Sequence, residues 1–317
     1  MVMSLRTLRT GLLAVLVVMT VGLAPGARSQ AQTPVPTCFG APAMDPTMPC
    51  VDRLSTVTPT VAGVDDEPMT PCRRLKAPAA VHVCAFGASK SRARLRLALI
   101  GDSHTFAWRA VLDQLGQSQG WRGYSLAEAA CMFSEATKSL PAGPREHCLA
   151  TYRATLGWLR SHPEIDVVIT THEADTALDV PEGRTNDAKI AGFRRTWKGL
   201  PHSIKRVIVL RDTPNASRDE LDCVERASAS GVTAAARACA EPRSWELTKD
   251  VAVAAARGLH SARYRVVDLS DLICSPVVCH PEVGGVLINR DTTGHVTQTF
   301  ARTTAPYLLR RLVPLLP

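Results

Sequence analysis

The hydrophobic positions of the chain follow two different patterns, which meet near residue 93. From residue 94 onward, short apolar runs alternate with segments whose apolar residues recur at helical spacing. The runs predict strands at 95–100, 124–130, 165–171, 206–210 and 264–269. Helices are predicted after residue 101, at about 148–159, at 245–260, and at 296–316 with a break or kink at Pro306. This alternation predicts a parallel sheet covered by helices on both faces.

The N-terminal part has no such period. Residues 32–92 are rich in proline and cysteine, and they predict an irregular extension stapled by disulfides. Residues 1–31 have the order of a secretory signal: positive charge at Arg6 and Arg9, an apolar run at 12–24, then small residues with a cut after Ser29 or Ala31. The run is shorter than the roughly 20 apolar residues of a spanning helix. An uncleaved anchor is the alternative.

Composition narrows the possible partners. Hydrophobic residues make up 45% of the chain and charged residues 21%, as in soluble globular proteins. Removal of residues 1–29 would take away three arginines and no acidic residue, so the net charge of +8 would fall to +5. No block of lysine and arginine is interleaved with aromatic residues, so the sequence does not predict nucleic-acid binding. The mild positive charge is compatible with weak attraction to anionic envelope polymers.

The chain has ten cysteines, and an even number behind an export signal indicates disulfides. Consecutive pairs are 5 to 17 residues apart, whereas the gaps between pairs span 22 to 75 residues. Short loops close at a lower entropic cost, so sequential pairing is the simplest scheme. It predicts the bonds Cys38–Cys50, Cys72–Cys84, Cys131–Cys148, Cys223–Cys239 and Cys274–Cys279. A zinc site at Cys274, Cys279 and His280 would lack a second ligand pair, and no metal is assigned.

Polar residues follow three of the predicted strands. Ser103 comes just after the first strand, His172 and Glu173 after the third, and Asp212 after the fourth. Reactive groups of a parallel sheet gather at the carboxyl ends of its strands, so these residues are expected to share one crevice. The acidic and histidine residues at 172–175 are interpreted as a solvated loop rather than a metal site.

Ser103 stands in the tetrapeptide Gly101-Asp102-Ser103-His104, at a predicted strand-to-helix turn. A serine hydroxyl becomes a good nucleophile when a neighbouring base accepts its proton. A glycine at a sharp turn exposes the side chain, and the start of the following helix directs backbone N–H groups toward a developing oxyanion. The alternative is an ordinary helix cap made by Asp102 or Ser103.

A matching base is present near the C-terminus, in Asp291-Thr292-Thr293-Gly294-His295. Histidine is the usual general base at neutral pH, and an aspartate on its second ring nitrogen fixes the tautomer. Three intervening residues permit a turn that returns Asp291 to His295. The alternative is a solvated turn in which Asp291 caps the terminal helix.

A strand that ends in Gly-Asp-Ser, with a late aspartate and histidine ahead of a terminal helix, resembles the SGNH (GDSL-like) hydrolases. The chain is similar above all to the SGNH domains fused behind membrane-embedded acyltransferase-3 domains, from Thr37 to the C-terminus. The motifs that carry this likeness are Cys38-Phe39-Gly40-Ala41, Cys84-Ala85-Phe86-Gly87, Gly101-Asp102-Ser103-His104, Arg211-Asp212-Thr213-Pro214, and Arg290-Asp291 with His295. The resemblance implies a three-layer flavodoxin-like fold, with Ser103 as nucleophile, His295 as base and Asp291 as orienting acid in a catalytic domain at 93–317.

The sequence departs from the family pattern at two places. The family has two residues between its aspartate and histidine, whereas this chain has three, so Asp268 or Asp271 could serve instead of Asp291. The asparagine expected after the third strand is replaced by Thr170-Thr171-His172-Glu173, and the second family block has Ala129-Ala130-Cys131 without a glycine. Candidates for oxyanion or substrate contacts are the backbone N–H of Ser103 and the side chains of Asp102, Thr171, His172 and Arg211. The motif at 211–214 is also consistent with a proline-fixed turn.

By this resemblance the chain is an exported O-acyl, and above all acetyl, esterase or acyltransferase. It would act on cell-envelope carbohydrate outside the cytoplasm, through an acyl-Ser103 intermediate and without a cofactor. The fused relatives carry a membrane domain where this chain has an export signal, so a separate membrane protein is a candidate acyl donor. The alternative is a glycan-binding domain of the same fold without catalytic activity.

We expect export with cleavage near residues 29–31, because the basic, apolar and small-residue segments follow one another in the order that signal peptidase recognises. N-terminal sequencing of the protein recovered outside the cytoplasm measures this directly. A recovered protein that still begins at Met1 would contradict it.

Overall fold

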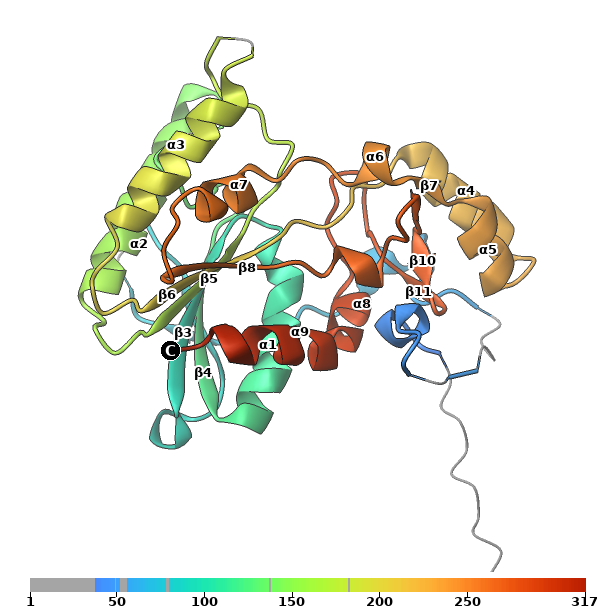
Figure 1. Ribbon diagram of the computed structural model, residues 1–317, viewed down its shortest axis with the longest axis horizontal. Helices are drawn as coiled ribbons and strands as arrows, with labels where there is room; N and C mark the ends of the chain where they lie inside the picture. Colours follow the sequence, from blue (N-terminus) through green and yellow to red (C-terminus); the bar gives the residue numbers. More distant parts are fainter. Residues whose placement is uncertain (1–37, 49, 52–55, 78–79, 137, 182) are drawn as a thin grey trace, which may run out of the picture. The chain divides into compact units, whose positions relative to one another are not determined.

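The computed structural model describes residues 38–317 apart from 49, 52–55, 78–79, 137 and 182. The predicted signal segment lies outside these residues. A seven-stranded sheet forms the centre, in the order β1-β2-β4-β3-β5-β6-β8 (Figure 1). The strands are β1 (Arg73–Leu75), β2 (Val83–Gly87), β3 (Leu95–Gly101), β4 (Trp121–Ala127), β5 (Val167–Thr171), β6 (Arg206–Leu210) and β8 (Tyr264–Val267). The five strands from β4 to β8 run parallel, whereas β1 and β2 are antiparallel to their neighbours.

Helices cover both faces of the sheet, which confirms the three-layer α/β fold (Figure 1). Alternate side chains of β3 show why: Leu97 and Leu99 belong to one core cluster, and Ala98 and Ile100 to the other. The first cluster is covered by α1 (Thr105–Gln119), α8 (Gln298–Thr303) and α9 (Ala305–Leu312). The second is covered by α2 (Ala142–Arg160), α3 (Thr185–Lys198) and α7 (Val251–Arg257).

The remaining elements are short. Helices α4 (Arg218–Ser228) and α5 (Val232–Ala238) enclose a third cluster with Val57, Val64 and Leu287. The others are α6 (Arg243–Glu246), the strand pairs β7 (Glu241–Pro242) with β9 (Val278–Cys279) and β10 (Glu282–Val283) with β11 (Val286–Leu287), and five 3-10 turns at 41–44, 64–66, 90–92, 270–272 and 313–315. Across the described residues, no helix combines the length and apolar character needed to cross a membrane.

The five predicted strands are present as β3, β4, β5, β6 and β8, with ends that shift by up to three residues. The continuous helix expected at 245–260 is wrong. Its first part is α6, and α7 begins only after Asp250, whose carboxylate accepts hydrogen bonds from the N–H groups of Ala252 and Val253. An aspartate in this position caps a new helix rather than continuing an old one. The terminal helix is broken near Pro306, as expected, into α8 and α9.

The structure differs from the expectation for part of the N-terminal segment. Residues 73–87 were expected to be irregular, but they contain β1 and β2, and β2 pairs with β4 inside the central sheet. These strands are short, and β2 has no polar alternation because Val83, Ala85 and Phe86 are all buried. The sheet therefore includes part of the segment that the sequence assigned to an extension.

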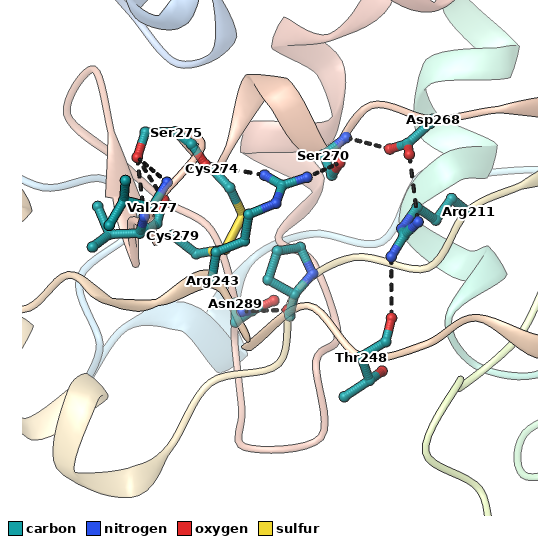
Figure 2. Close-up of a disulfide and its surroundings, with 12 residues drawn as sticks. Arg211, Arg243, Thr248, Asp268, Ser270, Cys274, Ser275, Val277, Cys279 and Asn289 are labelled. Carbon is teal, nitrogen blue, oxygen red and sulfur yellow. Dashed lines mark hydrogen bonds and ion pairs between the residues drawn. A yellow bond between two sulfur atoms is a disulfide. The ribbon is translucent and has the colours of Figure 1, made fainter. Parts of the chain in front are cut away.

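The described residues contain the five disulfides of the sequential scheme, with Cα atoms 3.9 to 5.7 Å apart. Figure 2 shows the bond between Cys274 and Cys279, so these two sulfurs are not zinc ligands. Cys72–Cys84 joins the residue just before β1 to β2. Each disulfide joins residues that are close in sequence, so these bonds constrain individual loops and hairpins and do not link distant parts of the chain.

The last residue of β3, Gly101, lies against the end of β5. A β-carbon on Gly101 would collide with the backbone oxygen of Thr171 and with the methyl group of Thr105. We therefore expect Gly101→Ala to lower the free energy of unfolding by about 1–3 kcal/mol, because backbone atoms must move.

The matched control is Gly157→Ala, at an exposed position of α2 where the added carbon meets no atom within 4 Å. This variant should gain about 1 kcal/mol from helix propensity. Urea unfolding followed by tryptophan fluorescence measures both. Equal stabilities of the two variants would contradict the close approach of β3 and β5.

Candidate active site

Ser103 lies in the turn between β3 and α1, and Asp102 fixes that turn. The carboxylate of Asp102 accepts one hydrogen bond from the N–H of His104, at 3.1 Å, and another from the N–H of Glu173, at 3.0 Å. Its carbonyl oxygen accepts from the N–H and the hydroxyl of Thr105, which starts the helix. Asp102 is buried, so it holds the turn against the end of β5 and does not line the cavity at Ser103.

Ser103, His295 and Asp291 form one chain of hydrogen bonds. The Oγ of Ser103 lies 2.7 Å from Nε2 of His295, and Nδ1 of His295 lies 2.7 Å from Oδ2 of Asp291. Partial burial opposes ionisation of Asp291, but hydrogen bonds from His295 and Thr293 hold the pKa of its carboxyl well below the ordinary value. The carboxylate is thus charged at neutral pH and can fix the proton on Nδ1 of His295.

The three-residue spacing is accommodated by a tight turn. Oδ1 of Asp291 accepts hydrogen bonds from the N–H and the hydroxyl of Thr293, at 3.0 and 2.8 Å. Gly294 has a positive φ of 81°, a conformation that glycine adopts easily. The N–H of Arg290 donates a hydrogen bond to the carbonyl of His295 and closes the turn. The extra residue therefore does not carry Asp291 out of reach.

The two alternative aspartates have other partners. Asp268 lies 3.6 Å from the guanidinium of Arg211, and Asp271 forms two hydrogen bonds with Arg311, at 2.6 and 2.7 Å. The structure therefore brings neither of them to His295.

A second histidine–aspartate pair lies next to the pair His295–Asp291. Nδ1 of His104 is 2.8 Å from Oδ1 of Asp212, both side chains are buried, and the rings of His104 and His295 are 4.7 Å apart. Burial alone would lower the pKa of His104, but the Asp212 carboxylate outweighs it and raises that pKa to about 9. The sequence had placed Asp212 at this crevice but gave no role to His104. Its position directly after the nucleophile was the available signal.

The other expected contacts do not reach the cavity. Thr171 and His172 are buried at the end of β5, where the ring of His172 packs on Phe193 of α3. Arg211 points to the carbonyl of Thr248 and to Asp268, as Figure 2 shows. None of these three residues lines the space at Ser103.

One backbone feature bears on the oxyanion donors. Ala130 has a φ of 61°, a conformation typical of glycine, in the stretch where the family resemblance places a glycine. The loop that contains it begins beside the nucleophile turn, because the N–H of Glu128 donates to the carbonyl of Gly101 at 3.1 Å. The backbone conformation of this turn is thus glycine-like although the residue is not glycine.

A cavity of about 330 Å³ opens at Ser103. Its walls include His104, Phe106 and His295, and it also takes in Asp65 and Met69 from the N-terminal segment. Asp65 forms an ion pair with Arg290 at 3.0 Å across this wall. Part of the predicted extension therefore shapes the space in front of the nucleophile, which the sequence did not indicate.

Residues 71–310 match the family described as the SGNH domain that is fused to AT3 domains. The chain belongs to this family. A search of curated proteins finds no match to this SGNH domain. Among solved structures, the periplasmic domain of the lipopolysaccharide acetyltransferase of Salmonella ser. Paratyphi A is similar, with a TM-score of 0.51 and 9% identity over 72% of this chain and 89% of that one. The esterase domain of a Rhodothermus marinus protein has a TM-score of 0.33 and 10% identity over 75% and 96%. At 9% identity, the likeness to the Salmonella domain shows the fold alone.

The buried pair His104–Asp212 should make the stability of this SGNH domain depend on pH. The pKa of His104 is about 9 in the folded state and about 6.5 in the unfolded state, so the contribution is complete below pH 6.5 and is lost as the pH rises through 9. We expect the free energy of unfolding of the wild type to fall over this range.

Asp212→Asn should lower that free energy by about 3 kcal/mol at pH 6, because the charged partner of a buried histidine is removed. In this variant, the free energy of unfolding should also change less between pH 6.5 and pH 9 than it does in the wild type. Urea titrations at several pH values measure both effects. An unchanged slope in the variant would show that the pair does not hold the proton.

Proposed function

We propose that this SGNH domain is a serine-dependent O-acyl esterase or acyltransferase, for which acetyl is the expected acyl group. The observation that carries the proposal is the hydrogen-bonded chain Ser103–His295–Asp291, with distances of 2.7 Å at each step and a cavity open to the serine. The family match supports the class of reaction. Nothing in the chemistry of these three side chains requires a cofactor.

In the first half of the reaction, Nε2 of His295 accepts the proton of Ser103 while Oγ attacks the carbonyl carbon of the ester. The tetrahedral intermediate collapses, the bond to the leaving group breaks, and His295 donates its proton to that group. The leaving group is the sugar oxygen in an esterase and the group that carries the acyl on the donor in a transferase. Asp291 stabilises the positive charge that His295 carries between these steps. The product is acyl-Ser103, together with a free sugar hydroxyl in the esterase or the released donor group in the transferase.

In the second half, water or a second sugar hydroxyl attacks the acyl carbon. His295 accepts the proton of the attacking group and returns it to Oγ of Ser103, so the protein is regenerated. Attack by water makes the protein an esterase, and attack by a sugar makes it an acyltransferase.

The expected oxyanion donors are backbone groups. The N–H of Ser103 precedes the first turn of α1, where the helix dipole favours negative charge. The glycine-like turn at Ala130 is a candidate for a second N–H donor, because it begins beside the end of β3. Two backbone donors would compensate for the missing asparagine of the family pattern.

The proposed substrate is a carbohydrate of the cell envelope, and the proposed place of action is outside the cytoplasm. The five disulfides support an oxidising compartment. The structurally similar Salmonella domain is periplasmic and belongs to an acetyltransferase of lipopolysaccharide, which supports an envelope glycan. A separate membrane protein of the AT3 type is the proposed acyl donor if the protein acts as a transferase.

Ser103→Ala and His295→Ala should each lower kcat/KM for 4-nitrophenyl acetate by at least about 10³-fold, and the double variant should be no slower, because the two residues act as one unit. Asp291→Asn should cost about 10²–10⁴-fold, because Asp291 is the carboxylate on Nδ1 of His295 and both alternative aspartates, Asp268 and Asp271, have other partners. His202→Ala, at an exposed histidine away from the cavity, is the control and should keep wild-type turnover.

Intact-mass measurement after incubation with this ester should show one added acetyl group, which Ser103→Ala abolishes. Folded Ser103→Ala with wild-type turnover would overturn the mechanism. A wild type that is neither active nor acetylated would instead favour a glycan-binding domain without catalysis.

A further inference from the structure

A second cavity of about 340 Å³ lies next to the one at Ser103. Phe106 of α1 lines both cavities and separates them. Arg109 lies three residues further along α1, on the same side of the helix, and it lines only the second cavity. At 1.5 Å per residue, Arg109 lies roughly 6 Å along the axis of α1 from Thr105, the first residue of that helix.

Arg109 is a partly buried cation that forms no ion pair with the residues that the structure describes. One Nη2 hydrogen bond goes to the carbonyl of Thr70, at 2.8 Å, and the buried Nε has no acceptor among the described residues. Burial lowers the pKa of Arg109, and the charge of Asp113 offsets this only in part. The Asp113 carboxylate is already hydrogen-bonded to the N–H of Gly87 and to Gln117. A charged guanidinium held in this way is stabilised by any anion that enters the cavity.

The other charged residues of the cavity are also basic. Arg74, on the edge strand β1, and His82 line it, and no aspartate or glutamate is among the lining residues of the described part of the chain. The ring of His82 lies 3.7 Å from the carboxylate of Glu128, so it already has a polar partner. Arg74 has no ion pair within the described residues, so the two arginines are the groups that face an incoming anion.

We propose that this second cavity binds an acidic substituent of the glycan whose acyl ester reacts at Ser103. The inference rests on the proposed function, and it specifies the substrate as an acidic glycan. An acetyl ester is only a few ångströms long, so a group at Arg109 belongs to another part of the glycan. Carboxylate and phosphate both match the planar fork of an arginine, so the acid is a uronic acid or a sugar phosphate.

Three O-acetylated oligosaccharides with one backbone test this: an oligogalacturonide, its neutral methyl ester, and an oligogalactoside that carries 6-phosphate. The quantity measured is kcat/KM for acetate release from each acidic substrate, divided by that for the neutral methyl ester. The wild type should give a ratio of at least about 10 for one of the two acidic substrates. The substrate that gives this ratio shows whether the cavity binds a carboxylate or a phosphate.

Arg109→Gln should lower that ratio about 10-fold, and Arg74→Gln should lower it less, because Arg74 is more exposed. Arg109→Lys should keep part of the ratio, because the positive charge remains. Arg310→Gln, at an exposed arginine of α9 that lines neither cavity, should leave the ratio unchanged. If Arg109→Gln does not fold, Arg74→Gln and Arg109→Lys still test the site.

Equilibrium binding distinguishes failure of this inference from failure of the proposed function. Titration of the Ser103→Ala protein with the deacetylated acidic oligosaccharides should give binding that weakens with added salt and with Arg109→Gln. Turnover of the neutral ester together with a ratio near 1 in the wild type would overturn the acidic subsite and leave the esterase intact. Absence of turnover together with arginine-dependent binding would support the subsite and overturn catalysis.

Discussion

Two buried carboxylates, those of Asp102 and Asp212, hold together the carboxyl ends of three parallel strands, and the rest of the site depends on them. Asp102 follows β3 and accepts the N–H of Glu173, just past β5. Asp212 follows β6 and accepts the N–H of Ala174 from the same segment, at 2.8 Å, together with Nδ1 of His104. A buried carboxylate is costly unless its oxygens are hydrogen-bonded, so each one specifies the distance between neighbouring strand ends. The segments after β3, β5 and β6 are thereby held in one arrangement.

The same arrangement positions the histidine that comes from the far end of the chain. The hydroxyl of Thr213 donates to the carbonyl of Gly294 at 3.2 Å, and the side-chain amide of Asn289 donates to the carbonyl of Pro214 at 3.0 Å. The loop after β6 therefore holds both sides of the turn that contains His295. This gives the Arg-Asp-Thr-Pro segment a supporting role: its aspartate binds His104, and its next two residues hold the loop of the proposed base.

The sequence predicted the features that depend on local patterns of residues. It did not predict contacts between residues that are far apart in the chain. The central strands are continuous apolar runs because both faces of the sheet are covered, and Ser103 and His295 stand in motifs that can be recognised locally. The pair His104–Asp212 joins positions 108 residues apart, and no periodic pattern reports such a contact. Thr171 and His172 were placed correctly at a strand end, but both side chains are buried, the ring of His172 against Phe193 of α3, and neither lines the cavity at Ser103. The position of a residue on a predicted strand indicates which residues lie near it. The direction in which its side chain points depends on how the neighbouring elements pack.

The N-terminal segment is part of the site for a comparable physical reason. Helix α8 begins three residues after His295, and the N–H groups of its first turn need acceptors. The carboxylate of Glu67 accepts from the N–H groups of Gln298 and Thr299, at 2.8 and 2.6 Å, and Gln298 in turn accepts from Thr70. A carboxylate at a helix N-terminus is favourable in itself, so this contact fixes the segment 67–70 beside the cavity. Since Thr70 also binds Arg109, the same few residues connect the wall of the Ser103 cavity to the basic cavity next to it.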